Sequence, residues 1–447
     1  RSNQHDVGTL TVIDATIYTT SLFRLRAGGV GLAFGGQFQH ETVSQGPDET
    51  RITLDLLGGP GFFPAEGERD VYAGYAELSV PVFGGEFTAP GFHALEFTAA
   101  VRYEEFSNTG QNVMVPKVGM RWQPLDDSLT IRATAGHGFK QPTLVELYAP
   151  DRGGPTDVFD PVTGQVASGV AVTILQNQNL QAEDSRNFSA GIVYSPKFVP
   201  GLTLTVDIFN IETSGYIDPL ANPSDVLRRV AEGNPLPNET ATRDADGDLI
   251  AFTYSLYNGG TQKARGLDFS AFYQLATAFG TFTSLTQATL LDSFQFSSAP
   301  GETERELRSQ PIPYFSATDF FSSRDAYLKW RGTSRLDWSW KGLSLAATAI
   351  YRDGFHEFLP NGNEHWVRQT WFFDLQGSYS FEPASNGGSN SARSVQPGWK
   401  RLAAGTTFTL GVRNVFDRDP PEAVGNYPRF IYDPTGRFVY FSLTKKF

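Results

Sequence analysis

The chain has 447 residues, no cysteine, 36 phenylalanines, 17 tyrosines and a formal net charge of −12. The acidic balance and the lack of a basic block argue against a nucleic-acid partner, because neutralising phosphates requires clustered Lys and Arg. No segment approaches the roughly 18 uninterrupted apolar residues that a membrane helix needs. A sheet that spans a membrane is not excluded, since its strands need only about 9 to 11 residues each.

Apolar and polar residues alternate with a period of two through almost every readable segment, which is typical of β-strands with two different faces. The chain is therefore expected to be all-β. We predict fifteen spanning strands, with boundaries that can shift by about two to four residues. The predicted strands are 9–23, 29–43, 70–83, 94–106, 112–122, 129–138, 185–194, 202–211, 261–275, 280–296, 326–340, 343–352, 368–382, 403–416 and 436–447.

The two faces of these strands differ in charge. Burying the charged face in a dry core would cost several kcal/mol for each unpaired ion, so this face must meet water or a polar partner. A sheet with one lipid face and one wet face satisfies both sets of residues. The residues predicted to point into the barrel lumen are Arg102, Arg132 and Asp268. The residues predicted to face lipid are Leu95, Phe97, Leu267 and Phe269.

Connections between the predicted strands alternate in length, which favours an outer-membrane barrel. Short ones include 123–128 and 341–342. In such barrels the short turns lie in the periplasm and the longer loops lie outside the cell. The long connections are 44–69, 139–184, 212–260, 297–325, 353–367 and 417–435. The predicted fold is a transmembrane antiparallel up-and-down β-barrel.

The end of the chain carries a recognisable pattern. Residues 411–417 read GVRNVFD, two prolines follow at 420–421, and GRF at 436–438 precedes the terminal Phe447. This pattern resembles the closing motif of TonB-dependent outer-membrane receptors. An aromatic terminal strand is, by this resemblance, the signal that the barrel-assembly machinery reads, so Phe447 is the predicted assembly signal.

Two further segments are similar to motifs of the same family. Residues 138–148, GFKQPTLVELY, resemble the signature GFRAPTLxELY, with departures at Lys140 and Gln141. Residues 179–185, NLQAEDS, resemble NLxPExS, with Ala182 in the place of proline. Three motifs in the family's order make the resemblance specific, and it extends over essentially the whole chain.

The resemblance implies that residues 1–447 are the C-terminal part of a barrel of 22 strands. About seven strands, the N-terminal plug domain and the TonB box are then expected to precede Arg1. The implied function is active uptake of a scarce solute, such as a siderophore, cobalamin or a carbohydrate, across the bacterial outer membrane with energy delivered through TonB. The expected partners are outer-membrane lipid, the TonB system, a small-molecule ligand and the barrel-assembly machinery.

Two other functions are weighed against uptake. A passive porin would share the alternation and the terminal aromatic residue, but it would not be expected to carry the motifs at 138–148 and 179–185. An outer-membrane enzyme is disfavoured, because no G-x-S-x-G elbow or comparable Ser/His/Asp set is present. No catalytic residue and no cofactor are therefore predicted.

Ligand contacts are expected in the loops 139–184, 212–260 and 353–367. Connections of about 15 residues or more exceed what a hairpin needs, so length indicates recognition or disorder. Aromatic and cationic side chains there can bind by stacking, cation–π contact or charge-assisted hydrogen bonds, although each is individually more often a simple rim residue. The candidates are Tyr148, Arg152, Phe159, Tyr216, Tyr257, Phe355, His356, His365, Trp366 and Arg368.

An aspartate-rich segment, 242–248, could be a metal site. It is not an EF-hand, because glycine occupies the fourth loop position and no bidentate Glu follows at the twelfth. A polar turn is the simpler interpretation, with a structural calcium at Asp244, Asp246 and Asp248 as the alternative. The ligand types in the segment 353–367 could suit zinc or iron, but their spacing matches no known metal motif.

Overall fold

The structure is a computed structural model. It describes residues 4–47, 49, 64–217, 223–297, 299–300, 302–309, 327–358, 364–381, 403–423, 432–433 and 435–446. Phe447, the predicted assembly signal, lies outside the described residues. No helix in the described part of the chain is long and apolar enough to cross a membrane.

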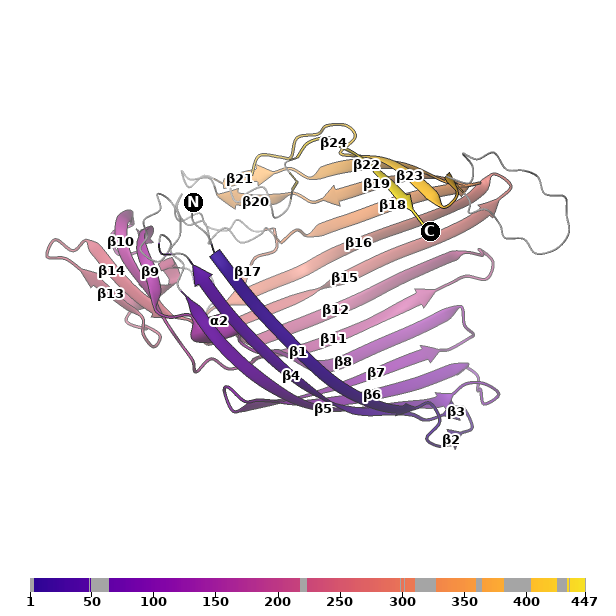
Figure 1. The fold of residues 1–447 in the computed structure, drawn as a ribbon, viewed down its shortest axis with the longest axis horizontal. Coiled ribbons are helices and arrows are strands. Elements are labelled where there is room, and N and C mark those ends of the chain that lie inside the picture. The colour runs from indigo at the N-terminus through magenta and orange to yellow at the C-terminus, as the bar shows by residue number, and fades with distance from the viewer. Residues whose placement is uncertain are drawn as a thin grey trace.

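One wide, twisted antiparallel sheet dominates the molecule (Figure 1). Fifteen of its strands pair in chain order, so each strand is bonded to the one before and the one after it in this series. The strands are β1 (Gln4–Thr19), β4 (Gly31–Pro47), β5 (Ala65–Phe83), β6 (Ala94–Phe106), β7 (Gln111–Gln123), β8 (Leu129–Lys140), β11 (Glu183–Tyr194), β12 (Leu202–Ile217), β15 (Asn258–Thr277), β16 (Gly280–Ser297), β18 (Trp330–Trp340), β19 (Leu343–Arg352), β22 (Thr370–Ser380), β23 (Thr406–Arg413) and β24 (Phe438–Lys445). All fifteen predicted strands are present, and the predicted all-β antiparallel fold is confirmed.

The remaining elements of the sheet are small. A two-residue strand, β17 (Arg305–Glu306), pairs with the end of β16. The hairpin β2 (Arg24–Leu25) and β3 (Gly28–Gly29) lies in the connection between β1 and β4. Among the described strands, β1 pairs only with β4 and β24 only with β23, so the sheet has two edges (Figure 1).

Some predicted boundaries were too generous. The prediction carried one strand to residue 416, whereas β23 ends at Arg413. Asn414 and Asp417 have positive φ values of 49° and 53°, a left-handed conformation that cannot continue a strand. Asn414 also closes the turn through its side chain, which accepts a hydrogen bond from the amide of Arg418 at 2.9 Å.

The strand register separates the two faces as predicted. Arg132, Asp207 and Asp268 lie on one continuous row, because Gly191 pairs with both Arg132 and Asp207, and Asp207 pairs with Asp268. Side chains of directly paired residues share a face. The neighbouring row on the opposite face is apolar and runs through Phe97, Met120, Ala133, Ala190, Ile208, Leu267 and Leu290.

The hairpin of β18 and β19 fixes this register tightly. Its turn consists of Lys341 and Gly342, with φ values of 48° and 83°. Positive φ at both central residues is typical of the two-residue turn that matches the twist of paired strands. Trp340 therefore faces Leu343, and counting back along both strands places Arg331 directly opposite Arg352.

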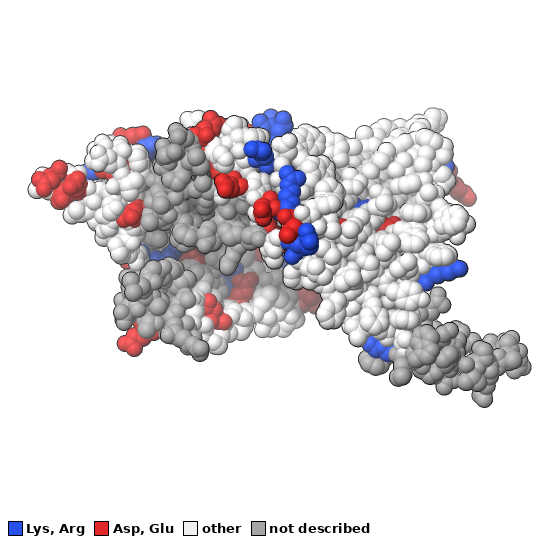
Figure 2. Space-filling view, turned by 90° about the horizontal axis from the view of Figure 1, so that it is seen from above, with Lys and Arg blue, Asp and Glu red and all other residues white. Residues whose placement is uncertain are grey.

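Tryptophans cap the end of the sheet that carries the short turns. The indole Nε1 of Trp122 donates to the carbonyl oxygen of Gly91, and that of Trp338 donates to Phe279, both at 2.9 Å. Amphipathic rings of this kind settle at the lipid headgroups of a membrane. Figure 2 shows charged side chains gathered toward the opposite end of the molecule, while the strands near the turns expose few on that face.

A second sheet lies beyond the strand ends at the charged end of the molecule (Figure 1). Its four strands are β9 (Arg152–Asp160), β10 (Gln165–Leu175), β13 (Thr240–Arg243) and β14 (Leu249–Ser255), and we call it the loop sheet. The pairing of β10 with β14 is parallel, from Ala171 opposite Ala251 to Leu175 opposite Ser255. Segments predicted only as the loops 139–184 and 212–260 thus form one folded unit.

The loop sheet has its own apolar core. Helix α3 (Pro223–Ala231) contributes Val226 and Leu227, and the strands contribute Val158, Val170, Leu249, Phe252 and Tyr254. Phe252 is only 1% exposed. Burying such a side chain contributes about 1.5 to 3 kcal/mol, which explains why the two long connections do not remain separate.

The motif at 138–148 folds into the join between the two sheets. Helix α2 (Leu144–Tyr148) begins with a capping box, in which the Thr143 hydroxyl accepts from the Glu146 amide and the Glu146 carboxylate accepts from the Thr143 amide. Leu147 packs in a core with Leu180, Ile217 and Leu256. These residues come from four segments, so the motif anchors the loop sheet to the wide sheet.

Candidate functional site

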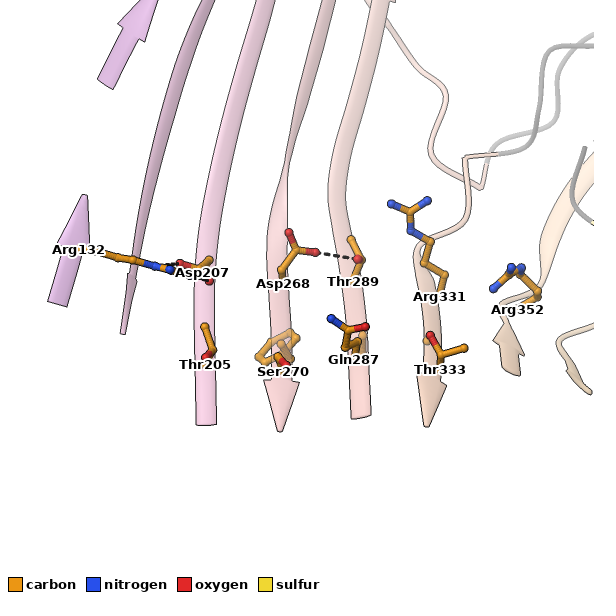
Figure 3. Close-up of a pocket in the computed structure, with 13 residues that line it drawn as sticks. Arg132, Thr205, Asp207, Asp268, Ser270, Gln287, Thr289, Arg331, Thr333 and Arg352 are labelled. Atoms are coloured by element: carbon orange, nitrogen blue, oxygen red, sulfur yellow. Dashed lines mark hydrogen bonds and ion pairs between the residues drawn. The ribbon is translucent and has the colours of Figure 1, made fainter. Parts of the chain in front are cut away.

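The charged face of the wide sheet is hollowed where six strands meet (Figure 3). This wall hollow has a volume of about 700 Å³ and lies over β8, β12, β15, β16, β18 and β19. Its polar lining faces the hollow from the same side of the sheet that carries the predicted lumen residues. The polar side chains are Arg132, Thr205, Asp207, Asp268, Ser270, Gln287, Thr289, Arg331, Thr333 and Arg352.

Charges at one side of the wall hollow are already paired. The guanidinium of Arg132 donates to both carboxylate oxygens of Asp207, at 3.0 and 2.7 Å. Asp268 accepts a hydrogen bond from the hydroxyl of Thr289 at 2.7 Å. Bidentate pairs of this kind are fixed in geometry, so this side presents a defined polar surface.

The other side of the wall hollow carries two cations together. Arg331 and Arg352 are direct cross-strand partners and lie next to each other in Figure 3. Within the described part of the chain, neither guanidinium has a carboxylate at ion-pair distance; Arg352 donates only to the carbonyl oxygen of Tyr351, at 3.2 Å. Like charges placed directly opposite each other destabilise a sheet.

A second hollow, the rim hollow, adjoins the first through Arg352. It has a volume of about 560 Å³ and is lined by Ile350, Arg352, Phe372, Asp374, Arg413, Asn414, Tyr432, Asp433, Thr435, Gly436 and Phe438. Both carboxylates in it are engaged by the backbone: Asp374 accepts from the Asn414 amide at 2.8 Å, and Asp433 accepts from the Thr435 amide at 2.9 Å. Hydrogen bonds from Thr435 lower the pKa of Asp433.

Tyr432 is the most confined polar side chain of the rim hollow. It is 3% exposed and packs in a core with Phe355 and Val367. Burial raises the pKa of its hydroxyl to about 12, so the group stays protonated at neutral pH. Among the described residues this hydroxyl has no hydrogen-bond partner. A buried hydroxyl without a partner costs about 1 to 3 kcal/mol.

The predicted ligand contacts in the first two loops lie at the join and in the loop sheet. Tyr148 covers β5 so closely that a side chain at Gly67 would meet its ring, and Arg152 and Phe159 are part of β9. At the end of β12, Tyr216 contacts Phe296 edge-on, with ring centroids 6.0 Å apart. The ring of Tyr257 lies against Gly259. Tyr148, Tyr216 and Tyr257 thus contact neighbouring residues, and Arg152 and Phe159 lie in a strand of the loop sheet.

The candidates in the third loop lie on a short hairpin, β20 (Phe355–Phe358) and β21 (Glu364–Val367), and its exit. Its inner face holds Phe355, 3% exposed, and His365, whose Nδ1 is 2.8 Å from the Glu357 carboxylate. Its outer face holds His356 and Trp366, whose ring centroids are 4.6 Å apart. Trp366 is 46% exposed.

Arg368, at the exit of this hairpin, is exposed and has no ion pair with any described residue. Trp366 and Arg368 are thus open to solvent, whereas Phe355 is committed to the core. The structure brings His356 and Trp366 together and separates them from the candidates of the first two loops. The residues of the two hollows were not among the predicted contacts.

Ion pairs connect the strands and the helix of the loop sheet. Arg243 donates to both oxygens of the buried Asp160 carboxylate at 2.7 Å, and this hydrogen bonding lowers the pKa of Asp160. Arg229 forms a buried pair with Glu239 and also donates to Glu302 at 3.1 Å. Removing one partner of a fully buried pair such as Arg229–Glu239 costs about 3 to 5 kcal/mol, and less is expected for Asp160, whose partner Arg243 is partly exposed.

The aspartate-rich segment forms the turn between β13 and β14. One Asp244 oxygen accepts from the amides of Asp246 and Asp248, at 3.0 and 2.9 Å. In the parts of the chain that the structure describes, no three His, Cys, Asp or Glu side chains are grouped as metal ligands. The polar turn is present, and calcium at this position remains a prediction.

The sequence matches the family described as TonB dependent receptor-like, beta-barrel, over residues 2–415. Together with a polar inner wall, an apolar opposite face and pairing in chain order, this match defines the class of protein. The chain belongs to the TonB-dependent receptor β-barrel family, whose members are outer-membrane proteins. No match was found among curated proteins.

Solved structures of receptors share the fold. A variant of the ferric enterobactin receptor of Pseudomonas aeruginosa superposes with a TM-score of 0.60 at 18% identity, over 98% of this chain and 54% of that one. A siderophore receptor of Acinetobacter baumannii gives 0.59 at 14% identity, over 98% and 55%. The pyoverdine outer-membrane receptor of Pseudomonas aeruginosa, bound to pyoverdine, gives 0.57 at 14%, over 99% and 54%. The chain therefore spans about half the length of the receptors it resembles.

Proposed function

We propose that this chain is the C-terminal part of the barrel of an outer-membrane receptor that takes up a scarce solute with energy delivered through TonB. The family match over residues 2–415 carries this proposal. A ferric siderophore is the leading ligand class, because the solved receptors that share the fold are named for ferric enterobactin, for a siderophore and for pyoverdine. In this arrangement the loop sheet faces the outside and the wall hollow faces the lumen.

The chemistry of the two hollows supports binding and passage of a polar solute. Guanidinium groups, hydroxyls and one amide line the wall hollow, and these groups can exchange hydrogen bonds with a ligand that has left water. The aromatic residues Phe372 and Phe438 in the rim hollow add stacking surfaces. We assign barrel-assembly machinery, lipid and the TonB system as partners on the basis of the family.

Uptake of iron-55 carried by a panel of siderophores tests the proposal directly. Cells with the intact gene should accumulate label from at least one siderophore, and cells without the gene or without TonB should not. Accumulation that is the same with and without TonB favours the passive porin instead. If no siderophore is taken up, labelled cobalamin and oligosaccharides distinguish the other solute classes from a receptor that does not transport.

We also propose that the exposed loop residues make the first contact with the ligand. Trp366, Arg368 and His356 are the preferred candidates, because their side chains are at least partly open to solvent. Tyr148, Arg152, Phe159, Tyr216, Tyr257, Phe355 and His365 are packed more closely and are expected to act through the shape of the rim.

Shortening the loops in the full-length protein tests this assignment. Removing the hairpin 355–367 should weaken ligand binding at the cell surface without affecting the loop sheet, since the hairpin pairs only with itself among the described strands. Removing 152–175 should also disrupt β14, because β10 is its parallel partner. Normal binding by both shortened and correctly folded proteins would place recognition outside these loops.

A further inference from the structure

The face of the wide sheet opposite the two hollows carries a groove of its own, which we call the outer groove. It has a volume of about 410 Å³ and crosses β7, β8, β11 and β12, which lie side by side (Figure 1). Ala135 pairs with Phe188 and lies two positions from Ala133 of the apolar row, so the groove opens on the apolar face. Its lining consists of Pro116, Lys117, Val118, Ala135, Gly136, His137, Arg186, Asn187, Phe188 and Asn210.

A row of polar side chains crosses one end of the outer groove. His137 pairs with Arg186, Arg186 pairs with Glu212, and Glu212 pairs with Lys263, so all four lie on the same face. Two positions nearer the short turns, Phe188 follows Arg186 and is 45% exposed. Four positions nearer the short turns, the row is entirely apolar. The outer groove therefore has an apolar floor and a charged end.

The height of this polar row matches the boundary of a membrane. Arg186 lies eight positions from Tyr194, at the short-turn end of β11. With a rise of about 3.3 Å per residue and a strand tilt of about 35 to 45°, this separation is roughly 20 Å along the membrane normal. The apolar band of an outer-membrane barrel is about 25 Å tall. Arg186 thus lies at the height expected for the headgroups of the outer leaflet.

The charges around Arg186 favour an anion as its partner. His137 Nδ1 lies 3.6 Å from an Asp184 carboxylate oxygen, and Lys263 Nζ lies 3.5 Å from a Glu212 carboxylate oxygen. Among the described residues, no carboxylate lies at ion-pair distance from Arg186. Further barrel strands would pair at the edges β1 and β24, and β8, β11 and β12 already have a partner on both sides. Completing the barrel would therefore leave this face open to the membrane.

We propose that the outer groove binds a phosphate-bearing lipid of the outer leaflet. Arg186 and His137 hold the phosphate, and one acyl chain lies along Val118, Ala135 and Phe188. A guanidinium group suits a phosphate because it donates two parallel charge-assisted hydrogen bonds. A lipid is the occupant because the floor of the groove lies within the apolar band, where a soluble anion does not reach. The site is on the opposite face from both hollows, so it is separate from the uptake of a solute.

Binding of two matched lipids to the purified full-length receptor tests the contact with phosphate. The probes are lipid A, which carries phosphate, and its dephosphorylated form, which has the same acyl chains. Native mass spectrometry measures the affinity of each. We expect the wild type to prefer lipid A by at least about fivefold, and Arg186→Gln to lose most of this preference, because phosphate then meets a neutral amide.

Ala135→Trp tests the contact with the acyl chain. Ala135 is exposed on the face of the sheet, so a larger side chain there fills the groove without entering a core. This variant should bind both lipids at least about fivefold more weakly and keep the preference for phosphate. Arg265→Gln is the matched control. It removes an arginine from the same face outside the groove, which Asp292 holds at 2.7 Å, and both affinities should stay within about twofold of the wild type.

Three results would overturn the proposal, provided that circular dichroism shows each variant to be folded. If Arg186→Gln and removal of phosphate weaken binding independently, the phosphate is held elsewhere. If Ala135→Trp binds lipid A as the wild type does, the lipid covers the surface without using the groove. If inorganic phosphate displaces lipid A at comparable concentrations, the site binds a free anion rather than a lipid.

Discussion

Replacing Phe252 by alanine tests whether the two long loops form one cooperative unit. Phe252 belongs to β14 and is buried at 1% exposure among residues of β9, β10 and α3. Truncating a buried phenylalanine costs about 3 to 5 kcal/mol, through lost transfer free energy and the remaining cavity. Because the wide sheet does not contribute to this core, the cost should fall on local opening of the loop sheet rather than on the barrel.

Hydrogen exchange of the full-length protein measures this opening strand by strand. A loss of about 3 to 5 kcal/mol corresponds to exchange that is roughly 10² to 10⁴ times faster wherever opening limits exchange. The acceleration should appear in β9 and β10, which belong to the other loop, as strongly as in β14. Amides of β8 and β11 should be unaffected. Ile250→Ala is the control, since Ile250 lies in the same strand but is 46% exposed.

The reasoning is refuted if the substitution accelerates exchange only within β13 and β14. That result would mean that the parallel contact between β10 and β14 contributes little and that each loop folds separately. Acceleration in the wide sheet itself would equally contradict the expectation, because the core of Phe252 would then be continuous with the barrel.

The remaining predictions concern charge and assembly. Asp160→Asn should lower the free energy of opening of the loop sheet by about 1 to 3 kcal/mol, because Arg243 then loses its carboxylate partner. Hydrogen exchange of the loop sheet should become faster as a result. The pKa of Asp160 is lowered in the folded state, so its contribution is full above the unfolded value near 4 and is lost as pH falls through the folded value. Exchange of the wild-type loop sheet, corrected for intrinsic rates, should accelerate below about pH 4, and Asp160→Asn should lack this step; identical pH profiles would contradict it. Deleting Phe447 should reduce the amount of receptor in the outer membrane more than its ligand affinity, and normal membrane levels would count against this.

The wide sheet could be predicted from the sequence because every strand meets two different solvents. One face must be apolar and the other polar along the whole strand, so the period of two persists and even short stretches such as 343–352 are readable. The face of Arg132, Asp268 and Leu267 followed from the same alternation. The strand ends were less certain, because a single left-handed residue such as Asn414 ends a strand without any change in hydrophobicity.

The loop sheet could not be predicted in the same way. Its strands are short, and the parallel pairing of β10 with β14 joins segments that no turn connects. A local signal did exist: residues 165–175, QVASGVAVTIL, are rich in β-branched residues. The sequence does not show that β14 is the partner of β10, because this pairing depends on the order of the barrel strands to which the two loops are attached.

The opposition of Arg331 and Arg352 was within reach of the sequence. The predicted turn at 341–342 leaves two residues between the strands, and a two-residue turn fixes every pair in the hairpin. The position of Tyr432 beside Arg352 in the rim hollow could not be predicted, since Tyr432 comes from a separate loop and only the fold brings the two residues together. Pairs within one hairpin can be predicted from the sequence, whereas neighbours that come from different hairpins cannot.

The parallel contact between β10 and β14 also has a consequence for the order of folding. Ala171 and Ala251 are 80 positions apart, and closing so long a loop in a free chain is slow. Once β8 is paired with β11 and β12 with β15, the bases of both loops are held in adjacent hairpins, and the remaining search is short. The loop sheet should therefore form last, after the strands below it have inserted. Its formation would then indicate that this section of the barrel is already paired.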